Sequence, residues 1–403
     1  MTALKELILD EVLETFQLTD WSSHAKNAYD ANGNATFFDA NGDLIEGIYL
    51  NMPNDVYHSL PAMSSTAMKK FMDSPAIYAR HYLSDVNRKR TLAQKRTLDA
   101  GTYGHELCLE PEGFYNRYFR DLVPADCPDA LQSTAQIEAA LVSAGLSAGE
   151  NKDDKLARLL RANPAVDVST LKTIKDIEAE LEKCGLSKSE SKLDKGYRLL
   201  AADPTAQVFD VLFMQNRLKH GAPKAIKVQD EDCMTYGDKL PIDGIVWDDA
   251  HRVQLTVRSH SQANAELQNG LPEVAIIARC PMTEMMLKVK FDWLRFDGAA
   301  ADVKTTRDTK PEKFKRQMQD LNYPTQQAFY CYVAELAEVV IDRFVFIAVE
   351  YLNADICQPY ELSERASQSA RRELMGSFKR FLKCKQTNNW YGWSEQDCTI
   401  VLD

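Results

Sequence analysis

The sequence predicts an α/β fold in which a mixed central sheet, flanked by helices, is interrupted by a helical insertion. Three observations predict it. In the second half of the chain, short apolar stretches typical of strands alternate with longer segments of helical spacing. A unit of about forty residues occurs twice in the middle. The composition, with 45% hydrophobic and 27% charged residues in 403, is ordinary for a globular protein.

Residues 1–46 are predicted to be an N-terminal extension. Apolar residues near helical spacing over residues 3–17 predict a helix. The Asn-Gly pairs at Asn32 and Asn41 predict hairpin turns.

A new unit begins near Gly47, and helices should follow it. Ser64 is a natural N-cap for a helix that ends near Met72. Two further helices are expected, over residues 76–83 and from Gly101 to near Pro111. Small residues in the second of these would allow close backbone approach.

The central repeat is expected to form the insertion, over residues 126–220. The pattern that begins at Ile137 recurs at Ile177, and each copy predicts a helix, a Gly-Leu-Ser turn and a second helix. Each copy resembles the SAP and helix-extended-loop-helix modules, which are often used on DNA. Residues 131–210 carry eleven Lys and Arg against thirteen Asp and Glu, so a role as a protein contact or spacer stays equally open.

After the repeats, the chain is predicted to complete the sheet. The main domain is therefore expected over residues 47–125 and 221–403. Its predicted strands cover residues 274–278, 285–292, 299–304 and 344–349, and its predicted helices cover most of 242–269, 323–338 and 363–382.

Composition excludes several classes of protein. No run of eighteen apolar residues exists, which excludes a spanning helix, and the acidic start of the chain is unlike a secretory signal. The nine cysteines are scattered without CxxC spacing, which favours reduced thiols over disulfides or a zinc site. We therefore expect a cytoplasmic protein without a membrane partner.

The formal net charge of −11 is unusual for a protein that binds nucleic acid. Local runs are basic, however. One lies between Lys69 and Arg96, and a second begins at Arg307. A solvated helix face explains such a run as well as DNA contact does. The candidate DNA-binding residues are Arg88, Lys89, Arg90, Lys95, Arg96 and Arg307.

The candidate chemistry lies at Asp302-Val303-Lys304, with Asp292 on the strand before it. Phosphodiester hydrolysis needs a metal to polarise the phosphate and an activated water, and Mg²⁺ prefers oxygen ligands. Alternation along a strand puts Asp302 and Lys304 on one face, where the lysine could orient or deprotonate a water or stabilise the transition state. Because a D-x-K run is common by chance, a solvated strand end explains it equally well.

Several motifs in the same order resemble the RecE (exonuclease VIII) family, within the PD-(D/E)xK nuclease superfamily. They cover roughly residues 47–120 and 240–385, outside the extension and the repeats. The motifs are Met63-Ser-Ser-Thr-Ala-Met-Lys69, Ser74-Pro75, Gly101-Thr-Tyr-Gly-His105, Glu273, Asp292, Asp302-Val-Lys304-Thr-Thr306 and Gln326-Gln-Ala-Phe-Tyr330.

The resemblance implies a role for each matching position. His105, Asp292, Asp302 and the carbonyl of Val303 would be metal ligands, and Lys304 the catalytic lysine. Glu273 matches an acidic position of less certain role. Gln326 and Tyr330 would lie one helical turn apart and position the strand or a metal-bound water. Each has a structural alternative, such as a core histidine or a polar rim, and Glu284 and Asp297 are alternative acids.

The resemblance also implies an activity and partners. It implies a Mg²⁺-dependent 5′-to-3′ exodeoxyribonuclease of phage or prophage origin, with Mn²⁺ expected to substitute. Such an enzyme would act on double-stranded DNA ends, form a ring of identical subunits and pass 3′ tails to a RecT-like annealing recombinase. A PD-(D/E)xK endonuclease and a non-catalytic DNA- or protein-binding module on the same fold remain alternatives.

Overall fold

The computed structural model describes residues 21–84, 102–228, 231–351, 355–395 and 399. The helix predicted over residues 3–17 lies outside them. The chain divides into two compact units, Met1–Phe114 with Asp248–Asp403, and Tyr115–Trp247. Each unit is described by itself. No helix in the described ranges combines the length and apolar character needed to span a bilayer.

The first unit is built on a mixed sheet, which confirms the predicted α/β fold. Among the described residues the sheet has seven strands in the order β1-β2-β7-β8-β9-β10-β11. Their bounds are β1 Lys26–Asn27, β2 Gly47–Leu50, β7 Gly270–Arg279, β8 Met286–Arg295, β9 Ala299–Thr306, β10 Arg343–Glu350 and β11 Cys357–Glu361. The pairs β1–β2 and β9–β10 are parallel and the other neighbours antiparallel.

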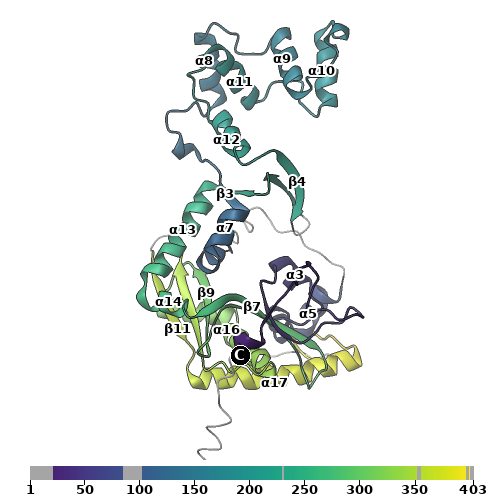
Figure 1. The fold of residues 1–403 in the computed structure, drawn as a ribbon, viewed down its shortest axis with the longest axis vertical. Helices are drawn as coiled ribbons and strands as arrows, with labels where there is room; N and C mark the ends of the chain where they lie inside the picture. The colour runs from purple at the N-terminus through teal and green to yellow at the C-terminus, as the bar shows by residue number, and fades with distance from the viewer. Residues whose placement is uncertain (1–20, 85–101, 229–230, 352–354, 396–398, 400–403) are drawn as a thin grey trace, which may run out of the picture. The chain divides into compact units, whose positions relative to one another are not determined.

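Helices cover both faces of this sheet (Figure 1). One face carries α4 Ser65–Asp73, α5 Pro75–Tyr82, α15 Pro311–Asp320, α16 Tyr323–Leu336 and α17 Glu364–Thr387. The other face of β9 and β10 carries the helical residues 102–109 with α13 Gly244–Ser259 and α14 Ser261–Glu266. Side chains alternate along β9, so Ala300 packs toward α16 while Ala301 and Val303 pack toward α13.

The described part of the predicted extension, residues 21–46, packs on this sheet together with α2 Trp21–His24 and α3 Asn54–Ser59. The Trp21 indole donates to the Arg295 carbonyl at 2.9 Å, and Phe37 is buried against β2 and β7. Both predicted turns are present. The first is closed by the antiparallel bridge Tyr29–Ala35, and the second by the bridge Phe38–Leu44. Gly33 and Gly42 supply the left-handed φ that each turn needs.

The second unit contains the repeats and, at either end of them, short strands that the sequence analysis did not predict. Its helices are α8 Thr134–Ser143, α9 Lys152–Ala162, α10 Ile174–Lys183, α11 Lys192–Ala202 and α12 Phe209–Leu218. Its strands pair as β3 Tyr118–Arg120 with β6 Leu240–Ile242, and β4 Pro223–Val228 with β5 Glu231–Tyr236. The helix α7 Pro111–Arg117 precedes them.

The two helices of each copy form as predicted, but their packing is crossed between the copies. Helix α8 packs on α11, and α9 packs on α10. The apolar clusters follow the same exchange, because Ile137 packs with Leu199 while Leu159 packs with Ile177. The helices of one copy therefore pack on those of the other copy. Equivalent apolar positions in the two copies can form either core equally well.

Two arginines related by the repeat hold the exchanged halves together. Arg158 is bound by Glu150 of its own copy at 2.8 Å and donates to the carbonyls of Ser187 and Lys188 in the other copy. Arg198 makes the reciprocal contacts, to Glu190 and to the carbonyls before Gly149. The repeats therefore form one cooperative body.

Replacing Arg158 by methionine should destabilise this body by about 1.5–3 kcal/mol, because its charged hydrogen bonds to the Ser187 and Lys188 carbonyls are lost and Glu150 keeps only Lys155. Arg161→Met is the matched control, since Arg161 is exposed and its ion pair with Asp194 should contribute less than about 1 kcal/mol. Hydrogen exchange of the α9 and α10 amides in the full chain would measure the difference. Equal protection in the two variants would contradict the crossed packing.

Candidate active site

Three carboxylates come from neighbouring positions of three adjacent strands. In the β7–β8 register, the pairs Pro272–Trp293 and Val274–Phe291 flank Glu273 and Asp292. Continuing the β8–β9 register by one residue places Asp302 opposite Asp292. The sequence analysis expected the two aspartates at strand ends, but both lie within longer strands. Antiparallel register is what brings them together.

The backbone of β7 is irregular at Glu273. Glu273 has a left-handed φ of 54°, which costs a residue other than glycine of the order of 1–3 kcal/mol. Side-chain alternation shifts there as well, because Phe291 and Leu294, three residues apart, pack into the same core cluster. Such strain persists where the surrounding structure imposes it, and it is common at functional sites.

Strands β8 and β9 separate beside the carboxylates. Their ladder contains only the pairs Trp293–Ala301 and Leu294–Ala300. Beyond it, the Asp292 side chain accepts a hydrogen bond from the Val303 amide at 2.8 Å. The side chain thus replaces a strand–strand hydrogen bond and is held in place by the backbone of β9.

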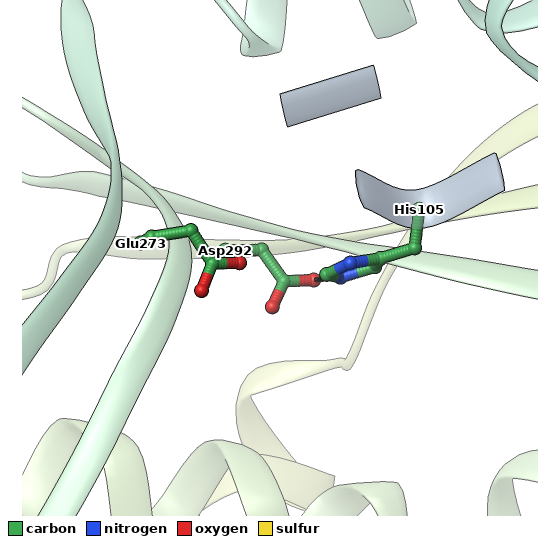
Figure 2. A group of neighbouring side chains, drawn as sticks. All are labelled: His105, Glu273 and Asp292. Carbon is green, nitrogen blue, oxygen red and sulfur yellow. Dashed lines mark ion pairs between the residues drawn. The ribbon is translucent and has the colours of Figure 1, made fainter. Parts of the chain in front are cut away.

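His105 meets the carboxylates from the helical residues 102–109. Its Nε2 lies 2.7 Å from Oδ2 of Asp292, and Figure 2 shows Glu273 beside this pair. The helix approaches α13 closely at Gly104, where a Cβ atom would lie 3.1 Å from Val253. The expectation of small residues for close approach is confirmed at this glycine.

His105, Glu273 and Asp292 could together hold a metal ion, because one ligand atom from each lies within 4.8 Å of the others. An imidazole with two carboxylates is a donor set for a divalent cation. Asp302 is not part of that group, and its assignment as a ligand stays a prediction, as does that of the Val303 carbonyl.

Asp302 lies between an amide and an ammonium. Its Oδ1 accepts a hydrogen bond from Nε2 of Gln326 at 2.6 Å. Its Oδ2 lies 2.5 Å from Nζ of Lys304, an ion pair without hydrogen-bond geometry. Burial lowers the pKa of Lys304, but Asp302 and Asp292 outweigh it and raise that pKa above its ordinary value. Lys304 is therefore a cation at neutral pH.

Tyr330, the second residue of the Gln326 motif, contacts strand β8. Its hydroxyl donates to the Lys290 carbonyl at 3.1 Å, and its ring packs edge-on against Phe291. The Lys290 ammonium in turn pairs with the Glu273 carboxylate. Tyr330 and Lys290 thus support the strand that carries Asp292 and Glu273.

Each acid of the cluster faces a basic side chain: Lys290 pairs with Glu273, His105 with Asp292, and Lys304 with Asp302. Burial, followed by the charge of Asp292, raises the pKa of Asp302 to about 6. Burial likewise raises the pKa of Glu273, against the opposing effect of Lys290. Burial lowers the pKa of His105, but Asp292, Glu273 and Asp302 outweigh it and raise that pKa to about 9. A divalent cation bound by His105, Glu273 and Asp292 would take the place of the proton on His105.

A metal must compete with the proton on His105, since only a neutral imidazole can be a ligand. The affinity of the metal-free protein for Mn²⁺ should therefore rise as the pH increases, until it levels off near pH 9. Calorimetric titration at several pH values, with proton release followed in two buffers, would measure this. His105→Gln should abolish the proton release, and an affinity independent of pH in the unaltered protein would contradict it.

Some predicted residues lie away from this cluster. Arg307 is exposed after the end of β9, and Arg88, Lys89, Arg90, Lys95 and Arg96 lie outside the described residues. Asp297 is paired with Arg295, and Glu284 lies in the turn between β7 and β8. The DNA-binding assignments stay predictions.

Three further residues were missed as members of the site: Lys69, Lys290 and Tyr323. Lys69 donates to Oε1 of Gln326 at 3.1 Å, and Tyr323 lies under the ammonium groups of Lys69 and Lys304. The sequence signals for all three were weak, but Lys290 stands two residues before Asp292 and could have been found from that spacing.

Comparison with known proteins agrees with this arrangement. Residues 227–400 match the family model described as a PDDEXK-like domain of unknown function. This segment is similar to a PDDEXK-like domain. The match includes Glu273, Asp292, Asp302, Lys304 and the Gln326 motif, whereas His105 precedes it. It supports placement of the domain in the PD-(D/E)xK nuclease superfamily.

Comparisons with curated proteins and with solved structures show no close relative. No curated protein matches the chain. A crystal structure from Eubacterium rectale, provisionally described as an exonuclease, is 10% identical, with a TM-score of 0.38 over 84% of this chain and 88% of that one. The structure of SSO0001 is 11% identical, with a TM-score of 0.21 over 34% of this chain and 59% of that one. At these TM-scores, neither says anything about activity.

Proposed function

We propose that this protein is a divalent-metal-dependent exodeoxyribonuclease that digests linear double-stranded DNA from 5′ ends and leaves 3′ tails. One observation carries the proposal: Glu273, Asp292 and Asp302 converge on adjacent strands of a PDDEXK-like domain, with Lys304 beside them. Hydrolysis at a metal site is the chemistry that this donor set supports. The preference for ends and the polarity rest on the RecE-like motifs of the sequence.

The chain's own residues would divide the chemistry between them. A bound Mg²⁺ or Mn²⁺, held by His105, Glu273 and Asp292, would polarise the phosphate and lower the pKa of a water. Because Lys304 is a cation, its role is to stabilise negative charge on the phosphate and not to remove a proton from water. Gln326 fixes the orientation of Asp302. Tyr330 supports β8 from behind the site.

The expected partners follow from the same resemblance. We propose that the protein forms a ring of identical subunits, since encircling DNA would provide processivity without sequence-specific contacts. We also propose that its 3′ tails pass to a RecT-like annealing recombinase. The exchanged repeats, with their near-neutral charge, would serve DNA engagement or assembly and not metal binding.

The test is digestion of a linear duplex labelled at either 5′ or 3′ ends, beside a closed circular plasmid of the same sequence. The expected result is release of the 5′ label with Mg²⁺ or Mn²⁺, no release in EDTA, and an intact circle. Cutting of the circle would identify an endonuclease. Binding of the duplex without cutting, with either metal, would identify a non-catalytic module.

A further inference from the structure

Lys69 is the one lysine of this cluster whose charge has no anionic partner among the described residues. Lys304 pairs with Asp302, and Lys290 pairs with Glu273. Lys288 is bound by three main-chain carbonyls at the end of α3. Lys69 has only the neutral Gln326 amide and the Tyr323 ring. A partly buried cation without an anion is costly, and an anionic ligand would offset that cost.

The position of Lys69 is fixed by the fold. Helix α4 buries Ala67, Met68 and Phe71 in the core of the first unit, which leaves Lys69 facing α16. Its Nζ lies 3.1 Å from Oε1 of Gln326, whose Nε2 donates to Asp302. The amine is thus separated from the D-x-K strand by a single side chain.

Tyr323 brings Lys69 and Lys304 together. The ammonium of Lys69 lies 5.4 Å from the centre of the Tyr323 ring, and that of Lys304 lies 5.0 Å from it. Burial and then the charge of Lys304 lower the pKa of Lys69 to about 7, against the opposing effect of Asp302. Two cations held on one aromatic ring repel each other, and Asp302, which pairs with Lys304, offsets that repulsion only in part.

We propose that Lys69 is a phosphate-binding residue of the site, which contacts a non-bridging oxygen of the DNA strand held beside Lys304. This inference rests on the proposed nuclease function. The bound phosphate supplies the anion that Lys69 lacks and offsets the repulsion between the two ammonium groups. Lys304 then acts at the phosphate being cut, while Lys69 holds the strand.

The test is the salt dependence of kcat/KM on a linear duplex in Mg²⁺. Each phosphate contact contributes about 0.7–0.9 to the slope of log affinity against log salt concentration, so Lys69→Met should reduce the slope by about that amount. Lys69→Arg should retain it, because the charge is kept. Lys379→Met, on the exposed side of α17, is the control for loss of one positive charge and should leave the slope unchanged.

A second measurement covers the case in which Lys69→Met is inactive. DNA should protect Lys69 of the unaltered protein from acetylation by an activated ester, mapped by mass spectrometry, and should leave Lys379 reactive. An unchanged slope, or full acetylation of Lys69 on saturating DNA, would overturn the proposal and reduce Lys69 to a positioning residue for Gln326. If the unaltered protein neither binds nor cuts duplex, the proposed function itself fails.

Discussion

Replacing Lys304 by methionine is expected to lower the rate of cleavage by about 10²–10³-fold, the usual effect of removing one preorganised charge from a transition state. Methionine is similar in length and should keep its packing on Tyr323, so the sheet should remain folded. The lost quantity is the positive charge beside Asp302. Single-turnover cleavage of an end-labelled duplex at saturating enzyme would measure it, because binding then no longer limits the rate.

The loss of Lys304 also changes Asp302. Without the lysine, the pKa of Asp302 should rise further above about 6, because Lys304 is among the groups that lower it. Binding of Mn²⁺ should be measured in parallel, to separate lost metal from lost transition-state charge. Lys315→Met, on the exposed face of α15, is the control and should cut at the original rate. Cleavage by Lys304→Met within threefold of the original would contradict the assignment.

The architecture of the first unit followed from the sequence because its elements carry strong local signals. The four predicted strands are β7, β8, β9 and β10, and Ser64 caps α4 as expected, with its hydroxyl accepting from the Ala67 amide at 3.3 Å. Apolar runs and caps are properties of neighbouring residues, so a single sequence reveals them. The strand β11 was missed, since Cys357–Glu361 is short and contains a proline.

The site was harder to predict, because its geometry depends on register. Glu273 was predicted as an acidic residue of the site, but its role was less certain, and nothing in its neighbours signals a left-handed φ or a position opposite Asp292. Lys69 lies 257 residues before Gln326, and only the packing of α4 on α16 brings them together. Spacing along the chain does not encode contacts of that range.

The repeats show a related limit. The offset of forty residues identified the duplication, but equivalent apolar positions in two copies fit either copy's partner equally well. The sequence pattern alone does not distinguish packing within a copy from exchange between copies.

Asp292→Asn is expected to weaken metal binding by at least about 10²-fold and to abolish cleavage with it. Loss of outer-shell partners alone typically costs 10–100-fold, and Asp292 belongs to the group of candidate ligands itself. The fold should survive, because the asparagine Oδ1 can still accept from the Val303 amide. The same oxygen would stay beside Nε2 of His105, because the Val303 amide and the imidazole contact a single oxygen of Asp292, so the substitution removes the negative charge and keeps both contacts.

The state of His105 provides a readout independent of catalysis. In metal-free Asp292→Asn, the pKa of His105 should be lower than the value of about 9 in the unaltered protein, because the Asp292 carboxylate is the largest factor raising it. The sign for stability follows: a raised histidine pKa stabilises the fold below about pH 6.5, and this contribution is lost as the pH rises toward 9. The stability of Asp292→Asn should therefore depend less on pH over that window.

Asp297→Asn, which removes an exposed acid paired with Arg295, is the control and should retain metal binding, cleavage and the His105 pKa. An unshifted His105 resonance in Asp292→Asn would mean that the ion pair does not form in solution.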